Sequence, residues 1–289
     1  MCQLTFIPKG NLMSIDTNVL NKVLYTVNDK GVATVTLDNA DKHNAFDDAI
    51  IKTLTDIFHD IASRDDIKIM VLDANGKSFS AGADLAWMKR MAGYSYEDNL
   101  KDANALAKML KALNFLPQTT IAKIQGAAFG GAVGLASCCD IVIASNKASF
   151  CLSEVKLGLI PATISPYVVN AIGLKASRRY FQTAERFFAD KAMQLGLVDE
   201  VVEMDALPSA VENMILTLLS NSPQAMRQAK QLAFDVAYQD INEQLLSDTS
   251  ERIARIRVSG EGQEGLSAFF EKRKPSWQQN ESTAANQAK

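Results

Sequence analysis

The sequence has few of the residues that build metal sites and disulfide frameworks. Its 289 residues include two histidines and four cysteines, with no C-x-x-C pair and no cluster that combines histidine with cysteine. Structural zinc sites depend on such spacing, so we expect no metal site. Cys138 and Cys139 are neighbours in an apolar stretch, which is typical of small buried thiols. Unpaired thiols suit a reducing compartment and indicate a cytoplasmic protein.

Basic blocks and long apolar runs are also missing. The chain has 30 basic and 33 acidic residues, a formal charge of −3, and no block of lysine or arginine. We therefore expect no nucleic-acid partner. No apolar run approaches the ~20 residues that cross a bilayer, so we expect no membrane span. Met1–Leu20 lacks a basic segment followed by a long apolar one, the pattern of a secretory signal.

The chain does contain alternating strand and helix patterns, in a composition that is 47% hydrophobic and 22% charged. Lys22–Asn28 and Gly31–Leu37 predict a β-hairpin, and Asp47–Ser63 has apolar residues at helical spacing. Short apolar runs that return after helical stretches predict a layered α/β core with parallel strands. The remaining predicted strands are Ile67–Leu72, Thr119–Ile124, Asp140–Ala144 and Ala148–Leu152, and the helices between them are Tyr96–Leu113 and Gly130–Ala136.

The character of the sequence changes after Glu203, where strand patterns give way to helical ones. The predicted helices are Ala206–Ser220, Pro223–Tyr238, Ile241–Val258 and Gly262–Lys272. We therefore predict three parts: a disordered extension at residues 1–17, an α/β core at 18–204, and a helical region at 205–289.

Two loops rich in small residues each follow a predicted strand and open a predicted helix. They are Ser78–Leu85 and Gly126–Ala132. Small residues let a backbone approach a ligand closely, and free N–H groups at a helix start attract negative charge. Two such loops could converge on one oxygen atom and form an oxyanion hole. Taken singly, each loop is also explained as a tight connection or as close helix–sheet packing.

Glu154 is a candidate acid/base residue. It lies between the apolar strand ending at Leu152 and the apolar loop Gly158–Pro161. A carboxyl group in such surroundings loses solvation, which raises its pKa and suits proton transfer near neutral pH. The alternative is an exposed glutamate on a loop.

The order of these motifs resembles the enoyl-CoA hydratase/isomerase (crotonase) superfamily. The matching segments, which extend from about Val23 to Trp277, are Asp41–Ala45, Ser80–Asp84, Gly126–Gly131, Ser153-Glu154 with Gly158–Pro161, Leu195–Val198 and Glu264–Lys274. The resemblance implies an α/β fold of the crotonase type, a spiral of ββα units. It also implies a C-terminal helical region that mediates trimers, often paired into hexamers.

The resemblance further implies an acyl-CoA thioester substrate, with CoA as part of the substrate and no separate cofactor. The N–H groups of Ala81 and Gly131 would hold the thioester oxygen and stabilise an enolate, and Glu154 would move the proton. Lys272 matches a position that can approach the CoA phosphates of a neighbouring subunit. The residues implied for substrate and CoA binding are Lys42, His43, Ala45, Ala81, Gly82, Ala83, Asp84, Gly131, Gly134, Ser153 and Lys272.

One position departs from the family pattern. Hydratases of the family carry two glutamates around the attacking water; Glu154 matches the second, and Gly134 stands where the first would be. Three interpretations follow. The chain is a hydratase in which Glu154 works alone, a 3-enoyl to 2-enoyl-CoA isomerase that needs only one base, or a non-catalytic CoA- or RNA-binding member.

A finer resemblance favours the hydratase. Gly130–Asp140 and Cys151–Tyr167 are similar to bacterial methylglutaconyl-CoA hydratase-like proteins, which also have glycine at the Gly134 position. We therefore expect 3-methylglutaconyl-CoA or a related branched enoyl-CoA as substrate. A distal carboxylate would need a cationic or hydroxyl partner. Lys156, Arg178 and Arg179 are candidates, although each is also typical of a surface residue.

Overall fold

The computed structural model describes residues 22–281 and contains two β-sheets in that range. The predicted disordered extension at residues 1–17 lies outside the described residues. The six-stranded sheet has the order β1 (Val23–Val27), β2 (Val32–Leu37), β3 (Ile69–Ala74), β5 (Thr119–Ile124), β7 (Ile141–Ser145) and β10 (Glu200–Val202). The four-stranded sheet has the order β4 (Ser78–Ser80), β6 (Ala127–Phe129), β8 (Ser149–Cys151) and β9 (Phe187–Phe188).

The predicted hairpin is confirmed as the antiparallel pair β1–β2. Its turn is closed by the side chain of Asn28, which accepts hydrogen bonds from the N–H groups of Lys30 and Val32, both at 3.0 Å. Gly31 completes the turn at φ 78°, a conformation that favours glycine. Strands β2, β3, β5, β7 and β10 then pair in parallel, as predicted for the core.

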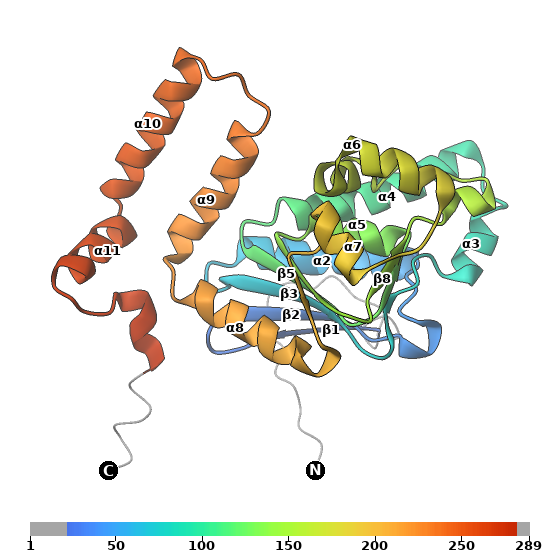
Figure 1. The fold of residues 1–289 in the computed structure, drawn as a ribbon, viewed down its shortest axis with the longest axis horizontal. Helices are drawn as coiled ribbons and strands as arrows, with labels where there is room; N and C mark the ends of the chain where they lie inside the picture. The colour runs from blue at the N-terminus through green and yellow to red at the C-terminus, as the bar shows by residue number, and fades with distance from the viewer. Residues whose placement is uncertain (1–21, 282–289) are drawn as a thin grey trace, which may run out of the picture.

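A repeating two-strand unit links the sheets. The chain completes β3, β5 or β7 in the large sheet, turns, and forms β4, β6 or β8 in the small one before a helical segment follows (Figure 1). This is the predicted spiral of ββα units. The helices of the core are α2 (Asp48–Ser63), α3 (Leu85–Met91), α4 (Tyr96–Asn114), α5 (Gly131–Cys138), α6 (Ser165–Thr183) and α7 (Ala189–Leu195), with a 3₁₀ turn η2 at Glu154–Leu157.

The main hydrophobic core lies between the sheets and these helices. Helix α2 shows how the sequence builds it: Asp47 caps the helix by accepting from Ile50 N–H at 3.0 Å, and one apolar face is buried. Leu54, Phe58 and Ile61 on that face have no exposed surface. Burial of such side chains contributes roughly 1.5–3 kcal/mol each.

The sequence analysis did not predict α6, α7 or β9. Pro166 stands in the first turn of α6, and Gly173 interrupts the helix with φ 73° and ψ 160°. This kink breaks the apolar periodicity that marks a continuous amphipathic helix. The short elements β9 and α7 are fixed by pairing with β8 and by packing on the core rather than by local pattern.

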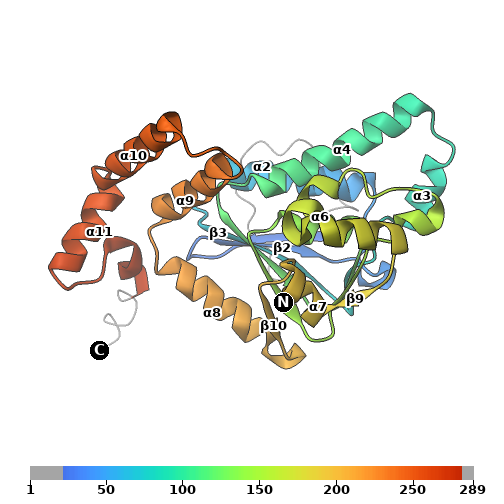
Figure 2. The ribbon, with the colours of Figure 1, turned by 45° about the horizontal axis from the view of Figure 1, so that its top comes forward.

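Four helices follow β10: α8 (Leu207–Leu219), α9 (Pro223–Val236), α10 (Glu243–Arg257) and α11 (Gly260–Phe270). Helix α8 packs on the large sheet through Leu207, Val211 and Ile215. Helices α9, α10 and α11 project away from the core as an arm in both views (Figures 1 and 2), and we call residues 223–270 the C-terminal arm. The division at residue 204 stays a prediction, because α8 shares a hydrophobic cluster with the strands.

The arm is attached to the core mainly by polar contacts of α9. Arg227 donates to the Asp65 carboxylate and to the Ile67 carbonyl, both at 2.9 Å. Lys230 forms an ion pair with Asp140 at 2.7 Å. One aromatic pair, Phe115 with Phe234, has ring centroids 5.0 Å apart. Helices α10 and α11 are consequently held by α9 and by each other.

Asn44 is the side chain that ties the loop after β2 to the β3–β4 turn. It is 2% exposed, donates to the carbonyls of Asn75 (2.7 Å) and Ser78 (2.8 Å), and accepts from Asn39 N–H (2.8 Å). Its φ of 54° is a conformation that asparagine tolerates better than alanine.

We expect Asn44→Ala to lower the free energy of unfolding by about 2–4 kcal/mol, because it leaves buried carbonyls unsatisfied. Urea denaturation measures the change. Asn213→Ala on the exposed face of α8 is the matched control and should cost less than about 0.5 kcal/mol. Equal effects of the two substitutions would contradict the role given to Asn44.

Candidate active site

The predicted motifs converge at one edge of the small sheet. Strands β4, β6 and β8 run parallel, so their carboxyl ends lie at the same edge. Ala81–Asp84 follows β4, Gly130-Gly131 follows β6, and Ser153-Glu154 follows β8. Ligands of α/β proteins bind where parallel strands end, so this edge is the candidate active site.

The backbones at this edge are in close approach. A Cβ added at Gly82 would lie 2.7 Å from the carbonyl oxygen of Phe129. Gly130 has φ 54° and ψ −122°, a combination that requires glycine, and a Cβ there would lie 3.3 Å from Oε1 of Glu154. The absence of a side chain at Gly130 therefore lets the Glu154 carboxyl reach the start of α5.

The Glu154 carboxyl group lies in surroundings that suit general acid–base chemistry. Its carboxyl group is largely buried, and Oε2 is buried without a hydrogen-bond partner among the described residues. Desolvation by burial raises the pKa of Glu154, while a hydrogen bond from its own backbone N–H opposes the rise. A buried polar atom without a partner costs free energy, which a reactant that bonds to the Glu154 carboxyl would recover.

Gly131 presents a free backbone donor beside this carboxyl. It is the first residue of α5, and its N–H has no hydrogen-bond partner in the described chain. The positive end of the α5 dipole adds to the attraction for negative charge. The aromatic ring of Phe46 fills the space where a side chain would be, since a Cβ on Gly131 would lie 2.6 Å from Cζ of Phe46.

The second predicted donor, Ala81, requires a correction. The N–H of Ala81 donates to the carbonyl of His43 at 2.9 Å, so it is already used within the fold. The prediction that Ala81 supplies a free donor is therefore wrong.

Ala83 supplies the free N–H instead. The backbone of Phe46 is hydrogen-bonded to both neighbours of Ala83. Its N–H donates to the Gly82 carbonyl (2.9 Å), and its carbonyl accepts from the Asp84 N–H (3.0 Å). In a parallel pair the residue between those two directs its own N–H to the opposite side. For Ala83 that is the side away from Phe46, where β6 pairs with β4, and the described residues provide no partner for this N–H.

The predicted CoA-binding residues before and after β4 form one connected surface. Lys42 is half-exposed and forms an ion pair with Asp84 at 2.9 Å. Asp84 itself caps α3 through Ala86 and Trp87 N–H, and the Lys42 ammonium holds its pKa below the ordinary value. His43 is exposed and contacts Ser78 Oγ through Nδ1 at 3.2 Å, whereas Ala45 is 7% exposed. Lys42 and His43 are thus open to a ligand, while Asp84 and Ala45 are buried.

Gly134 is not open to a ligand, contrary to prediction. It lies in the second turn of α5, and Ile164 covers it: a Cβ at Gly134 would lie 2.8 Å from Cβ of Ile164 and closer to Cγ2. Ile164 is only 2% exposed and has little room to move. A carboxylate at position 134 therefore has no space.

Asp140 does not replace the missing carboxylate. It follows the opposite, C-terminal end of α5, where it accepts from Thr120 Oγ1 and Lys230 Nζ at 2.9 and 2.7 Å. Glu154 is the carboxyl group that lies against Gly130, the residue before the free amide of Gly131.

Ser153 and Lys272 differ in their relation to the site. Ser153 directly precedes Glu154 and is half-buried at the edge. Lys272 follows α11 and is exposed, and α11 lies away from α5 and β8 (Figure 1). The structure therefore does not bring Lys272 to the site of its own chain.

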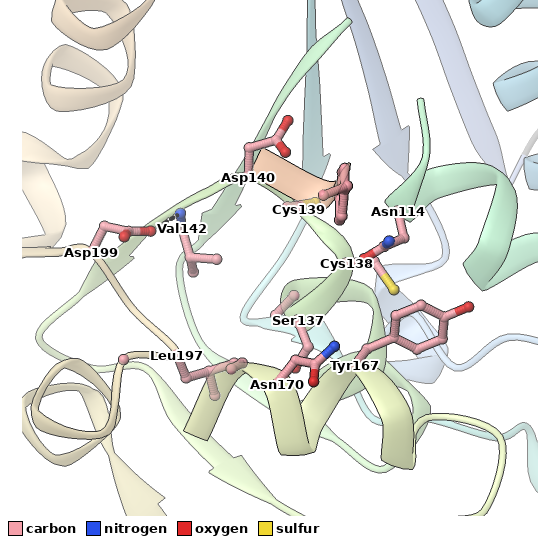
Figure 3. A pocket seen from close by; sticks show the side chains of 14 residues that line it. Asn114, Ser137, Cys138, Cys139, Asp140, Val142, Tyr167, Asn170, Leu197 and Asp199 are labelled. Atoms are coloured by element: carbon pink, nitrogen blue, oxygen red, sulfur yellow. Dashed lines mark hydrogen bonds between the residues drawn. The ribbon is translucent and has the colours of Figure 1, made fainter. Parts of the chain in front are cut away.

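A cavity of about 260 Å³ lies at the other end of α5 (Figure 3). Asn114, Ser137, Cys138, Tyr167 and Asn170 are among the residues that line it. No predicted site residue belongs to it. The eight residues of α5, at ~1.5 Å rise per residue, separate it from Gly131.

Neither a metal-binding group nor a membrane-spanning helix is found within residues 22–281. Histidine, cysteine, aspartate and glutamate side chains form no group of three or more that could hold a metal ion. None of the helices in this range is both long and apolar enough to cross a membrane.

Fold and site together define an α/β protein with two free backbone donors and one buried carboxyl group at the same edge of the small sheet. Comparison with known proteins agrees with this class: residues 28–280 match the family model described as enoyl-CoA hydratase/isomerase. The chain belongs to the enoyl-CoA hydratase/isomerase family, the crotonase superfamily, and is an enzyme of that class.

Individual relatives include both kinds of enzyme. A solved enoyl-CoA hydratase from Shewanella pealeana is 51% identical, covers 91% of this chain and 100% of its own, and has a TM-score of 0.86. The short-chain-enoyl-CoA hydratase of Clostridium acetobutylicum is 30% identical over 88% of this chain and 97% of its own. The trans-2-decenoyl-[acyl-carrier-protein] isomerase of Streptococcus mutans is also 30% identical, with the same coverage.

Sequence reasoning missed three residues that shape the site: Phe46, which fills the space at Gly131; Ile164, which fills the space at Gly134; and Arg186, which stacks on Phe129 beside Gly130. All three lie far along the chain from the residues they contact. The glycines were the available signal, because each marks a place where another group comes close.

The buried carboxyl gives a prediction about stability. Because the folded-state pKa of Glu154 is raised above its ordinary value of 4.5, the folded protein binds this proton more tightly than the unfolded chain. Its contribution to stability is therefore lost as the pH rises through the folded-state pKa. We expect Glu154→Gln to raise the melting temperature at pH 8, and the gain to shrink as the pH falls toward 4.5. Thermal denaturation across this range measures it, and a gain that does not change with pH would contradict the assignment.

Proposed function

We propose that this enzyme is a hydratase that adds water across the 2,3 double bond of an enoyl-CoA thioester. The observation that carries the proposal is the Glu154 carboxyl, buried without a partner at the same edge of the small sheet as two unused backbone donors. The thioester oxygen would accept hydrogen bonds from Ala83 and Gly131. Each preorganised donor of this kind contributes roughly 3–4 kcal/mol to stabilising the transition state.

The chemistry needs only the backbone donors and one carboxyl group. Polarisation of the thioester carbonyl makes the β-carbon electrophilic and stabilises the enolate that forms when water adds. Glu154 takes a proton from the attacking water and returns a proton to the α-carbon, which completes the addition. The raised pKa of Glu154 brings its two protonation states closer in free energy near neutral pH, which suits both halves of this transfer. No separate cofactor takes part.

CoA would extend from the thioester toward the β4 side of the edge. The half-exposed ammonium of Lys42 and the exposed imidazole of His43 are the groups there that can meet phosphate or ribose. Asp84 supports this surface by fixing Lys42 and capping α3. Gly82 and Ala83 contribute backbone, and Ser153 borders the reacting end.

One observation favours a second candidate, a 3-enoyl to 2-enoyl-CoA isomerase. Ile164 excludes a second carboxylate at Gly134, and an isomerase needs a single base to move one proton. A non-catalytic CoA- or RNA-binding role is the third alternative, and a buried carboxyl with a raised pKa gives it no support. For the hydratase we propose 3-methylglutaconyl-CoA or a related branched enoyl-CoA as substrate. We also propose a cytoplasmic location, which suits the free thiols of Cys138, Cys139 and Cys151.

The mechanism predicts a specific kinetic defect in Glu154→Gln. The amide keeps the shape of the side chain but cannot accept a proton, so kcat should fall by about 10⁴-fold while the Kd for CoA thioesters stays within a few fold. Stopped-flow turnover and calorimetric titration measure the two quantities. Near-normal kcat in the folded variant would refute the single-carboxyl mechanism.

Isotope labelling distinguishes the two reactions. In ¹⁸O-labelled water a hydratase must place solvent oxygen on the β-carbon, whereas an isomerase moves the double bond and gains no oxygen. Mass spectrometry of the product decides between them, with the isomerase tested on a 3-enoyl-CoA. An active enzyme that yields unlabelled product would replace the hydratase by the isomerase.

We also propose that the enzyme is a homo-oligomer, a trimer or a hexamer built from trimers, with the C-terminal arm at the interface. The arm exposes several large apolar side chains that a monomer leaves in water: Leu246 at 48%, Ile253 at 47%, Leu266 at 44%, Phe269 at 77% and Phe270 at 74%. A second copy of the chain would cover them and would bring Lys272 toward a neighbouring site.

Light scattering after gel filtration should therefore give three or six times the 31.5 kDa chain mass. Phe269→Asp with Phe270→Asp should shift the mass toward the monomer, because charge opposes burial at the interface. A control substitution at an exposed residue of the core, Lys175→Asp, should leave the mass unchanged. A monomeric wild type at micromolar concentration would contradict the proposal.

A further inference from the structure

Helix α3, which follows the Ala83 donor, has few attachments to the rest of the molecule. Of its seven residues Trp87 alone is buried, at 3% exposed, whereas Leu85 is 81% exposed. An ion pair of Arg90 with Asp48, at 2.5 Å, joins α3 to α2 through two half-exposed side chains. Surface ion pairs of this kind stabilise little. The position of α3 therefore depends mainly on Trp87.

The indole of Trp87 is hydrogen-bonded to helix α4. Its Nε1 donates to Oδ1 of Asp102 at 3.1 Å. Asp102 is half-buried, and burial raises the pKa of its carboxyl group while the hydrogen bond from Trp87 opposes the rise. Because this carboxyl group is partly shielded from water, solvent does not fully replace the bond when the bond is lost. Asp102 thereby fixes the side chain on which α3 depends.

Trp87 is connected to Ala83 through the residue that caps α3. The Trp87 N–H donates to Asp84 Oδ1 at 3.1 Å, and the Asp84 N–H donates to the Phe46 carbonyl at 3.0 Å. On the other side of Ala83, the Gly82 carbonyl accepts from the Phe46 N–H at 2.9 Å. In a trans peptide the carbonyl of one residue and the N–H of the next point in opposite directions. The contact with Phe46 therefore directs the Ala83 N–H away from Phe46.

Phe46 supports the second free donor as well. Its ring fills the space beside Gly131, where an added Cβ would lie 2.6 Å from Cζ of the ring. In the register of β4 with β6, Ser80 pairs with Ala128. Ala83 and Gly131 each follow three residues after these paired positions. Phe46 is thus the common support of both free amides, and a displacement of α3 would move one of them relative to the other.

We propose that Asp102 is a positioning residue for the two backbone donors: its bond to the Trp87 indole holds α3 in place and so keeps the Ala83 N–H directed at the thioester oxygen. The inference rests on the proposed function, in which that oxygen accepts hydrogen bonds from Ala83 and Gly131. Preorganised donors stabilise developing charge because they need no rearrangement during the reaction. Asp102 acts through Trp87 and needs no contact with the substrate.

Loss of the bond should lower kcat and leave KM within a few fold. Trp87→Phe removes the indole N–H and keeps an aromatic ring, and Asp102→Leu removes the acceptor at similar size. Each should lower kcat by about 10- to 100-fold, the effect of a small misplacement of a group that acts on the substrate. The double variant should lose no more than either single variant, because all three lack the same bond. Asp102→Asn retains an acceptor oxygen and should keep kcat close to that of the wild type.

Trp277 provides the matched control. Its Nε1 donates to the carbonyl of Ser220 at 3.1 Å, so Trp277→Phe removes an indole hydrogen bond of the same length outside the site. This variant should leave kcat unchanged, as should Asn104→Leu at an exposed position of α4. The proposal is overturned by an equal loss of kcat in Trp277→Phe or by additive losses in the double variant. It is also overturned if Asp102→Asn loses as much as Asp102→Leu, since the charge and not the hydrogen bond would then be needed.

A spectroscopic measurement separates this proposal from the proposed reaction. Infrared difference spectra of bound butanoyl-CoA, labelled with ¹³C at the thioester carbonyl, report how strongly the donors polarise that carbonyl. The acyl group is saturated, so no turnover is needed. The carbonyl stretching frequency should be lowered in the wild type, in Asp102→Asn and in Trp277→Phe, and should return toward its value in water in Trp87→Phe and Asp102→Leu.

That pattern supports the proposal even if the enzyme hydrates no enoyl-CoA thioester, in which case only the proposed reaction fails. An equally lowered frequency in the wild type, Trp87→Phe and Asp102→Leu would overturn the role of Asp102 while leaving the proposed reaction intact. A frequency in the wild type equal to that in water would overturn both, because the two amides would then not polarise the thioester.

Discussion

The close approach of backbone at the ends of β4, β6 and β8 is the constraint on which the site depends. Gly82 lies against the Phe129 carbonyl with no space for a side chain, and Gly130 combines a tight approach to the Glu154 carboxyl with a backbone conformation that requires glycine. Side chains there would separate the three strand ends. The two free amides and the carboxyl could then no longer face one small reactant. The glycines therefore fix distances between functional groups as well as permitting turns.

This arrangement lowers the stability of the fold and leaves polar groups available for catalysis. A carboxyl group buried without a partner costs free energy, and two backbone donors without acceptors add to that cost. The surrounding structure compensates with fully satisfied polar groups nearby. Asn44 makes three hydrogen bonds between loops, and Asp84 combines a helix cap with an ion pair. Glu154 Oε2 is the buried side-chain atom without a partner at the place where a thioester would bind, while others, such as Gln118 Oε1 and Arg227 Nε, lie outside the site.

The small sheet also gives the site a direction. Parallel strands place donors and acid at one edge. The C-terminal arm lies outside this arrangement and exposes several large apolar side chains.

Sequence alone determined the elements whose stability is local and the motifs whose residue types are unusual. The hairpin, α2, α4 and β5 follow from periodicity, and Glu154 was identified from its apolar surroundings. Tertiary structure decided which groups are free. Ala81 and Ala83 lie two residues apart in one motif, yet only Phe46 and His43, from another loop, determine that the Ala81 N–H is used and the Ala83 N–H is not. Gly134 likewise gives no sign of Ile164, nor Phe129 of Arg186. The physical reason is that the direction of an N–H group and the filling of a space depend on the neighbouring strand or side chain, which the chain supplies from a distant position.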